Sequence, residues 1–332
     1  MITKKRVMTQ DAGVNWAQSN QINYSWHSFC VTLTGRIIAG SSNNGLWYSD
    51  DNGVSWTQSD KTNETWGNLC ITSTGRIIAS SNDVGIWYSD NNGVNWAQSN
   101  GTNNSWGALC VTPTGRIITT RYGSAAGIRY SDDNGETWVQ SNKTVYSWYT
   151  LCITPTGRII AGSDSYGIWY SDDNGETWTQ SNKTNGTWYA LCVTPTGRIV
   201  ASGGNNGLWY SDDNGVNWTQ LSQTAGTPGW GKLCVTLTGR IIASCDGQGI
   251  WYSDNNGVNW TRPQTSSMSW RALCVIPTGR VIVGNFNGNG IWHSDPVTSL
   301  ITEYTSKPLT GKQAKALVQQ CKAYVQTLKN GN

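Results

Sequence analysis

Short apolar runs alternate with stretches rich in Gly, Asn, Asp, Ser and Thr along most of the chain. Short apolar or β-branched runs bounded by such turn-forming residues are typical of antiparallel strands. In one representative segment the pattern predicts four strands, at residues 66–72, 76–80, 86–89 and 94–98. The runs Leu69-Cys70-Ile71 and Ile77-Ile78-Ala79 are apolar on both faces, which indicates strands that are covered on both sides.

This four-strand pattern occurs seven times. A Thr-Gly-Arg turn recurs at intervals of 40, 40, 42, 40, 42 and 40 residues, with its glycine at Gly35, Gly75, Gly115, Gly157, Gly197, Gly239 and Gly279. A second phrase, Ser-x-Asp-x-Gly-x-x-Trp, ends at Trp16, Trp56, Trp96, Trp138, Trp178, Trp218 and Trp260. A period of about 40 residues with four strands per unit is the signature of a β-propeller blade. We therefore expect an all-β fold, a seven-bladed β-propeller of four-stranded blades.

The two ends of the repeat array predict how the ring closes. The chain begins partway through a repeat, and Pro296 stands where the last copy's turn should continue. Proline cannot donate to a strand ladder, so the last copy supplies three strands. Residues near 5–18 should complete the seventh blade, which gives a propeller over 1–296 and an extension over 297–332. Apolar residues from Ala314 to Leu328 follow helical spacing and predict an amphipathic helix at about 310–329. That helix would pack on the propeller, or else bind a protein partner or a second copy.

The turn phrase identifies a known repeat. Ser49-Asp50-Asp51-Asn52-Gly53-Val54-Ser55-Trp56 resembles the Asp-box, or BNR, repeat of sialidases, sortilin-type receptors and other propellers, and the resemblance covers roughly residues 9–295. It implies a structural role, in which the acid bonds N–H groups of the turn and the tryptophan is buried under the hairpin. The central box positions are Asp11, Asp51, Asn91, Asp133, Asp173, Asp213 and Asn255. The chain is thus similar to propeller lectins and to non-catalytic relatives of sialidases.

The arginine of each Thr-Gly-Arg turn invites a binding role, but a structural one is expected. The turn lies at the same end of a blade as the box. Each arginine should therefore pair with the acid ahead of the central box position, such as Asp50, Asp90, Asp132 or Asp172.

Composition excludes several classes of function. Charged residues make up 13% of the chain and the net charge is +3, which gives no electrostatic reason to expect nucleic acid as a partner. The sequence has no apolar run long enough to insert into a membrane and no signal peptide in its first residues. We expect synthesis in the cytoplasm, with release by lysis or non-classical export left open. Seven of the nine cysteines occupy one equivalent position per repeat and are expected to be small buried hydrophobes: Cys30, Cys70, Cys110, Cys152, Cys192, Cys234 and Cys274.

Catalytic chemistry is not expected. A glycosidase needs two carboxylates in unlike environments, yet the repeats are nearly identical and the chain has only Glu64, Glu136, Glu176 and Glu303 as glutamates. The motifs of nucleotide-binding loops and metal sites are also missing from the sequence. We therefore expect a protein that is not an enzyme and that needs no cofactor or metal.

The aromatic content suggests binding instead. The chain has 20 Trp and 14 Tyr but only 2 Phe, and indole faces stack on sugar rings while Asn side chains bond hydroxyls. The candidate sugar-binding tryptophans open the first predicted strand (Trp26, Trp66, Trp106, Trp148, Trp188, Trp230 and Trp270) or the third (Trp47, Trp87, Trp169, Trp209 and Trp251). Loop residues Asn43, Asn82 and Asn205 join them. Packing between blades is the alternative role for each tryptophan.

These residues predict a carbohydrate-binding protein, a multivalent lectin or adhesin whose partners are glycans or glycoconjugates. Repeated weak sites would add up to strong avidity on a glycosylated surface. A protein-binding scaffold or assembly factor is the alternative, and a sialidase-like glycosidase is a third.

Overall fold

The computed structural model describes residues 15–20, 23–100, 105–121, 127–143, 146–203, 205–224, 229–262 and 268–295. These residues belong to one compact unit, Asp11–Pro296. The predicted helix at 310–329 and the extension 297–332 lie outside the described residues, as does Asp11 of the first box. Within the described ranges, no helix has the length and apolar character that crossing a membrane would require.

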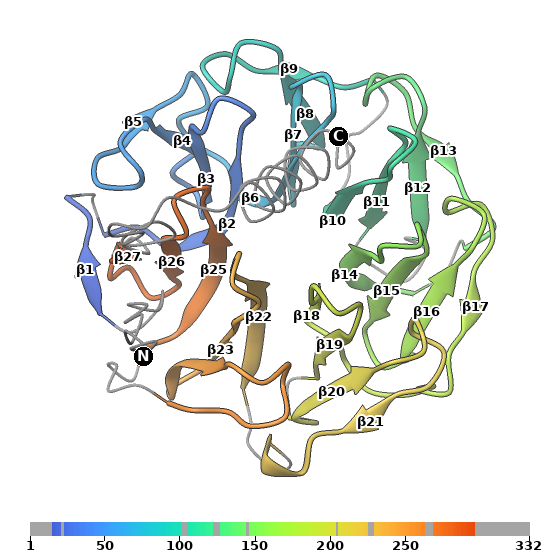
Figure 1. Ribbon diagram of the computed structural model, residues 1–332. Helices are drawn as coiled ribbons and strands as arrows, with labels where there is room; N and C mark the ends of the chain where they lie inside the picture. The colour runs from blue at the N-terminus through green and yellow to red at the C-terminus, as the bar shows by residue number, and fades with distance from the viewer. Residues whose placement is uncertain are drawn as a thin grey trace, which may run out of the picture. The chain divides into compact units, whose positions relative to one another are not determined.

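The described residues form a seven-bladed β-propeller, as the repeats predict (Figure 1). Every blade is an antiparallel sheet in which consecutive strands pair in order from the centre of the ring outward. The innermost strands are β2 (Trp26–Val31), β6 (Trp66–Ile71), β10 (Trp106–Val111), β14 (Trp148–Ile153), β18 (Ala190–Val193), β22 (Trp230–Val235) and β25 (Trp270–Val275).

The second strand of each blade is completely buried except at isolated ends. These strands are β3 (Ile37–Ser41), β7 (Ile77–Ser81), β11 (Ile117–Arg121), β15 (Ile159–Ser163), β19 (Ile199–Ser202), β23 (Ile241–Cys245) and β26 (Val281–Asn285). The third strands are β4 (Leu46–Ser49), β8 (Ile86–Ser89), β12 (Ile128–Ser131), β16 (Ile168–Ser171), β20 (Leu208–Ser211), β24 (Gly249–Ser253) and β27 (Ile291–Ser294).

The outer strands are shorter than predicted. They are β1 (Trp16–Gln18), β5 (Thr57–Gln58), β9 (Ala97–Gln98), β13 (Val139–Gln140), β17 (Thr179–Gln180) and β21 (Thr219–Gln220), and a 3₁₀ turn, η1 (Ser222–Thr224), follows the last of them. The strand expected at 94–98 is reduced to two residues because the box turn holds the preceding backbone, with Asn95 N–H donating to Asn91 Oδ1 at 2.9 Å. In the sixth blade a single bridge between Tyr252 and Thr261 stands in place of the fourth strand.

The ring closes as the sequence predicts. Strand β1, from the N-terminal part of the chain, pairs with β27 in the seventh blade, with Trp16 opposite Ser294 and Gln18 opposite Trp292. The first and last repeats therefore share one sheet, and the blade order continues around the ring.

The core lies between neighbouring blades. In one interface Ile38 of the first blade packs against Trp66, Ile77 and Trp96 of the second. Trp66 and Ile77 are 0% exposed and Trp96 is 6% exposed. Burying a large apolar side chain stabilises a fold by about 1.5–3 kcal/mol relative to leaving it exposed, so each interface is a substantial source of stability.

The Asp-box turns have the structural role that the resemblance implies. Asp51 Oδ1 accepts hydrogen bonds from the N–H groups of Val54 and Ser55, at 3.0 and 2.8 Å. Although burial alone would raise the pKa of Asp51, hydrogen bonds from Ser55, Ser49 and Val54 lower it. The indole N–H of Trp56 donates to Gly53 O at 3.2 Å, which fixes the tryptophan beneath the turn.

The other described boxes are built in the same way. Asp133, Asp173 and Asp213 also accept backbone N–H bonds. Asn91 and Asn255 keep the equivalent bond, to Asn95 and Asn259.

The predicted arginine–aspartate pairs are confirmed in the first six blades, whereas Arg280 of the seventh donates to Asn52 O at 3.2 Å instead. Arg36 forms a two-pronged pair with Asp50, at 2.7 and 2.8 Å, and its third nitrogen donates to Asn92 O of the next blade at 3.0 Å. Equivalent pairs join Arg76 to Asp90, Arg116 to Asp132, Arg158 to Asp172, Arg198 to Asp212 and Arg240 to Asp254. These arginines therefore link the turns of neighbouring blades.

The repeated cysteines are free thiols on the innermost strands. Cys192 is buried and the other six are half-buried, and burial raises the pKa of thiols such as Cys30 and Cys110, each to about 12. Across the described residues, no group of three or more His, Cys, Asp or Glu side chains is placed to hold a metal ion.

Candidate binding pocket at the mouth of the channel

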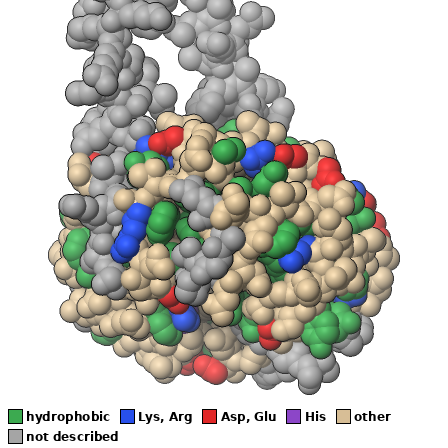
Figure 2. Space-filling model, turned by 90° about the horizontal axis from the view of Figure 1, so that it is seen from below, with side chains coloured by type: hydrophobic (Ala, Val, Ile, Leu, Met, Phe, Trp, Pro, Cys, Tyr) green, Lys and Arg blue, Asp and Glu red, His purple; other side chains and the backbone are tan. Residues whose placement is uncertain are grey.

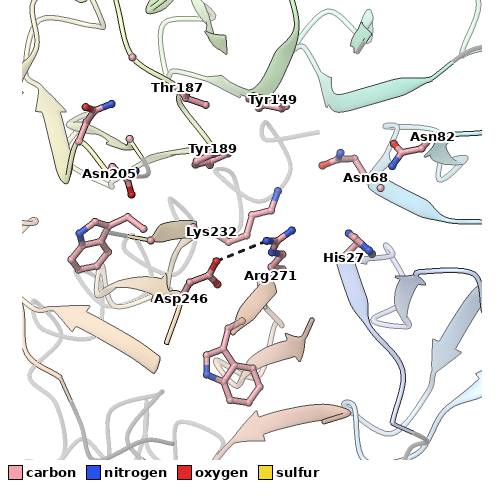
Figure 3. Close-up of a pocket in the computed structure, with 18 residues that line it drawn as sticks. His27, Asn68, Asn82, Tyr149, Thr187, Tyr189, Asn205, Lys232, Asp246 and Arg271 are labelled. Carbon is pink, nitrogen blue, oxygen red and sulfur yellow. Dashed lines mark ion pairs between the residues drawn. The ribbon is translucent and has the colours of Figure 1, made fainter. Parts of the chain in front are cut away.

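A pocket of about 770 Å³ opens on the axis of the ring, at the end where the innermost strands begin. Residues of six blades line it (Figure 3). Its wall includes the residue after the tryptophan that precedes or opens the innermost strand in six blades, the next residue in two blades (Asn68 and Lys232), and residues of the surrounding loops. We call it the channel-mouth pocket.

The seven repeats differ sharply at these pocket positions. The residue after the tryptophan is His27, Gly67, Gly107, Tyr149, Tyr189, Gly231 or Arg271, in chain order. At the next position Asn68 and Lys232 line the pocket, whereas Ser28, Ala108, Thr150, Ala190 and Ala272 are buried and do not. The three residues after these return to Leu or Phe, Cys, and Val or Ile in every copy. Near-identical blades therefore become unequal where they face the pocket, and the ring gains one asymmetric site.

Two cations lie side by side in the pocket. Figure 3 shows the amino group of Lys232 and the guanidinium of Arg271 directed toward its middle, from adjacent blades. Burial and the charge of Arg271 lower the pKa of Lys232. Arg271 approaches Asp246 at 3.9 Å, which is an ion pair too long for a hydrogen bond, and no described carboxylate pairs with Lys232. The pocket thus has an excess of positive charge.

His27 responds to the same charges. Burial, Lys232 and Arg271 lower the pKa of its imidazole from 6.5 to about 4, so the ring is neutral at pH 7. Its ring packs edge-on against Phe286 at 5.4 Å, and Nε2 is a buried atom without a hydrogen-bond partner in the described structure. The imidazole can therefore supply a neutral hydrogen-bonding group without adding to the charge.

Uncharged polar and aromatic groups complete the wall. Asn68, Asn82 and Asn205 present amides, and Asn82 Oδ1 is a buried acceptor that no described group satisfies. The rings of Tyr149 and Tyr189 lie 5.5 Å apart at 35°, and Tyr189 is 43% exposed. The pocket therefore combines cations, amides and open aromatic surface.

The predicted sugar-binding tryptophans lie mainly in the core. Those that open the innermost strands are 0% exposed at Trp26, Trp66, Trp106, Trp148 and Trp188, 1% at Trp230 and 4% at Trp270. Their indoles contact the box tryptophans of the same blade, as Trp66 does with Trp96 at 6.4 Å. Such burial favours the packing alternative, although Trp230 and Trp270 also contribute to the pocket wall.

The tryptophans of the third strands lie away from the pocket. Trp47 is 7% exposed, and Trp87, Trp169, Trp209 and Trp251 are half-buried. Lysine ammonium groups cover the rings of Trp87, Trp169 and Trp209, at 3.7, 3.2 and 3.8 Å from the ring centroids. Of the predicted loop residues, Asn82 and Asn205 line the pocket, whereas Asn43 lies outside it and accepts a bond from Thr65 Oγ1 at 3.0 Å.

Six residues of the pocket wall were not predicted from the sequence: Lys232, Arg271, His27, Asn68, Tyr149 and Tyr189. A comparison of the seven copies could have found them. The two positions that follow the invariant tryptophan differ strongly from copy to copy. The outer surface carries no comparable feature in the view of Figure 2, where uncharged polar side chains and backbone predominate and charged side chains are scattered.

The fold and its turns define the class: the chain is a seven-bladed β-propeller built from Asp-box repeats. The family model for the BNR/Asp-box repeat matches residues 129–140 and 169–180. No curated protein sequence matches the chain.

Solved structures with the same fold have diverse functions. A catalytically inactive virginiamycin B lyase from Staphylococcus aureus with quinupristin has a TM-score of 0.69 at 11% identity, over 84% of this chain and 98% of that one. YCF48 bound to D1 peptide has a TM-score of 0.70 at 15% identity, over 90% and 100%. YCF48 from Cyanidioschyzon merolae has a TM-score of 0.64 at 15% identity, over 84% and 98%. At these identities the likeness concerns the fold alone.

Proposed function

We propose that this protein is a carbohydrate-binding propeller and that it holds one acidic saccharide in the channel-mouth pocket. The observation that carries the proposal is the asymmetry of the pocket. At the position after the tryptophan, six nearly equal blades line the pocket with one His, two Gly, two Tyr and one Arg, and a single ligand with several distinct groups would be matched by such a wall. Seven equal sites would instead require the same side chains in each blade.

The chemistry of the wall supports a sugar. Asn68, Asn82 and Asn205 can exchange hydrogen bonds with hydroxyl groups, and the exposed ring of Tyr189 can stack on the C–H face of a pyranose. A volume of about 770 Å³ falls within the range of ligand pockets, about 300–1,000 Å³. These groups would therefore fix both the position and the orientation of a sugar ring.

The excess positive charge supports an acidic ligand. Placing two cations together in a half-buried pocket costs stability unless an anion neutralises them. A carboxylate or sulfate between Lys232 and Arg271 would do so with charge-assisted hydrogen bonds, which are about twice as strong as neutral ones. The same pair would reject neutral sugars that leave it uncompensated.

The carboxylates near the pocket favour binding over hydrolysis. Among the described residues of the wall, Asp246 is the one carboxylate, and it lies beside Arg271. Glycoside hydrolysis commonly uses two carboxyl groups on opposite sides of the scissile bond. We therefore propose recognition without bond cleavage.

Binding to an array of neutral, carboxylated and sulfated glycans tests the proposal. We expect the full-length protein to bind acidic glycans, and Lys232→Gln and Arg271→Gln each to weaken binding about tenfold or more, the effect of losing about 1.4 kcal/mol. Lys183→Gln is the matched control, because Lys183 covers Trp209 outside the pocket. Equal binding of neutral glycans would contradict the acidic specificity, and an array without any binding would contradict the carbohydrate proposal and leave a peptide as the ligand to test next.

A further inference from the structure

The fourth blade carries a pair of stacked tyrosines beside the channel-mouth pocket. The rings of Tyr146 and Tyr166 lie 3.9 Å apart at an angle of 20°. Tyr166 is 48% exposed although one face of its ring is covered by Tyr146. The other face of Tyr166 is therefore open to solvent.

Tyr146 holds its position in a conformation that suits glycine. Its φ is 76°, and Gly186 occupies the equivalent position of the fifth blade with a φ of 88°. Glu64 has a φ of 60° at the same position of the second blade, so the positive φ belongs to the turn of the repeat, and in the fourth blade this turn carries a bulky ring. Here Trp148 and Trp169 pack against the Tyr146 ring, at 6.2 and 6.4 Å between centroids.

The tyrosine pair is continuous with the pocket. Tyr166 forms a parallel bridge with Gly186, and Gly186 and Thr187 line the pocket. Asp164 connects the two regions, since its carboxylate accepts hydrogen bonds from Thr187 Oγ1 at 3.0 Å and from Tyr149 OH at 3.4 Å. Tyr166 therefore lies beside residues that line the pocket.

Other blades have half of this arrangement at most. In the first blade Tyr24 occupies the position of Tyr146 and packs against Trp26 and Trp47. The loop position of Tyr166 is taken in the other described blades by Asn44, Val84, Asn206, Gln248 and Asn289. The stacked pair with its open ring face is therefore an individual feature of the fourth blade.

We propose that Tyr166 is a stacking subsite for a second sugar residue, so that the ligand is an oligosaccharide chain that runs from the pocket over the fourth blade. The proposal rests on the proposed function, because it assumes a saccharide in the channel-mouth pocket. Tyr146 is a positioning residue that supports the Tyr166 ring from behind. Lys143 adds a positive charge beside the tyrosine pair. Its ammonium lies 3.2 Å from the centroid of the Trp169 ring and 5.5 Å from that of Tyr146.

Calorimetry with chains of increasing length tests this subsite. The probes are galacturonic acid and N-acetylneuraminic acid as monomers, dimers, trimers and tetramers, titrated into the full-length protein. We expect affinity to rise about fivefold from monomer to dimer or trimer in one of the two series, because a good aromatic stack contributes on the order of 1 kcal/mol. Tyr166→Ala should abolish that gain while monomer affinity stays within about twofold, and Tyr166→Phe should restore it.

Gln248→Ala is the matched control, because Gln248 takes the loop position of Tyr166 in the sixth blade and does not line the pocket. Folding of Tyr166→Ala is expected to be unchanged, since the Tyr166 backbone carbonyl rather than its ring accepts the bonds from Trp169 and Gln180. Equal losses for monomer and trimer, or a length gain that survives Tyr166→Ala, would overturn the subsite and leave the proposed function standing. Absence of binding by every saccharide in both series would overturn both.

Discussion

Lowering the pH should destabilise this propeller through His27. Burial, Lys232 and Arg271 lower the pKa of His27 from 6.5 to about 4. Between these values the unfolded chain binds a proton that the folded chain does not, so stability rises with pH in this window. Linkage gives roughly 2 kcal/mol of folding stability lost between pH 7 and pH 5 from this ring, and solvent screening reduces it to about 1–2 kcal/mol.

Urea denaturation of the wild type and of His27→Gln at pH 7 and pH 5 isolates this contribution. Carboxylates titrate in both proteins, so the difference between them reports on His27. We expect the wild type to lose about 1–2 kcal/mol more than the variant on acidification. Since the chain has 2 histidines, NMR of histidine-labelled protein can assign the His27 signal by its loss in the variant.

The same spectra connect the effect to the two cations. Lys232→Gln removes one positive charge near the imidazole, so it should raise the pKa of His27 toward its ordinary value. A measured pKa of 6 or above in the wild type would refute the reasoning, as would a pKa that does not respond to Lys232→Gln. Either result would mean that the pocket is more hydrated, or its cations more distant, than described.

Three further predictions concern the scaffold, and urea denaturation measures each. Trp66→Ala should cost about 3–5 kcal/mol because the indole is 0% exposed, and lost ligand affinity with unchanged stability would contradict its core role. Asp51→Ala should cost about 2–3 kcal/mol through lost turn hydrogen bonds, whereas Asp51→Asn should cost less than about 1.5 kcal/mol, as Asn91 keeps the turn in its own blade. Gly93→Ala should cost at least about 1–3 kcal/mol, because its Cβ would lie 2.5 Å from Ile38 Cδ1 at a φ of +84°; an unchanged midpoint would show that the neighbouring turn relaxes freely.

The fold was predictable because repetition amplifies weak local signals. A single short apolar run such as Ile86–Ser89 could form many structures, but seven copies at a spacing of 40 to 42 residues restrict the choice to a closed array. Ring closure by β1 was predictable because the chain begins partway through a repeat and the last copy lacks its fourth strand. The arginine pairs followed from the two turns lying at the same end of each blade.

The binding site was less predictable because tryptophan serves both packing and binding. The residue type does not tell a buried tryptophan such as Trp66 from an exposed one that stacks on a ligand. Both roles use the same apolar ring, and both occur next to glycine-rich loops. The informative positions were instead the variable residues next to these tryptophans, such as Lys232 and Arg271. Their convergence depends on a register irregularity early in the innermost strands, as between Trp230 and Leu233, which the sequence does not reveal.

The number of saccharides bound per chain tests the central claim most directly. Calorimetric titration of the full-length protein with the acidic glycan that binds most tightly on the array should give one site per chain. The same titration of the double variant, which carries both Lys232→Gln and Arg271→Gln, should give no measurable binding while the fold stays intact. Several equivalent sites per chain that survive both substitutions would contradict a single channel-mouth site. They would instead favour the multivalent lectin that the sequence predicted.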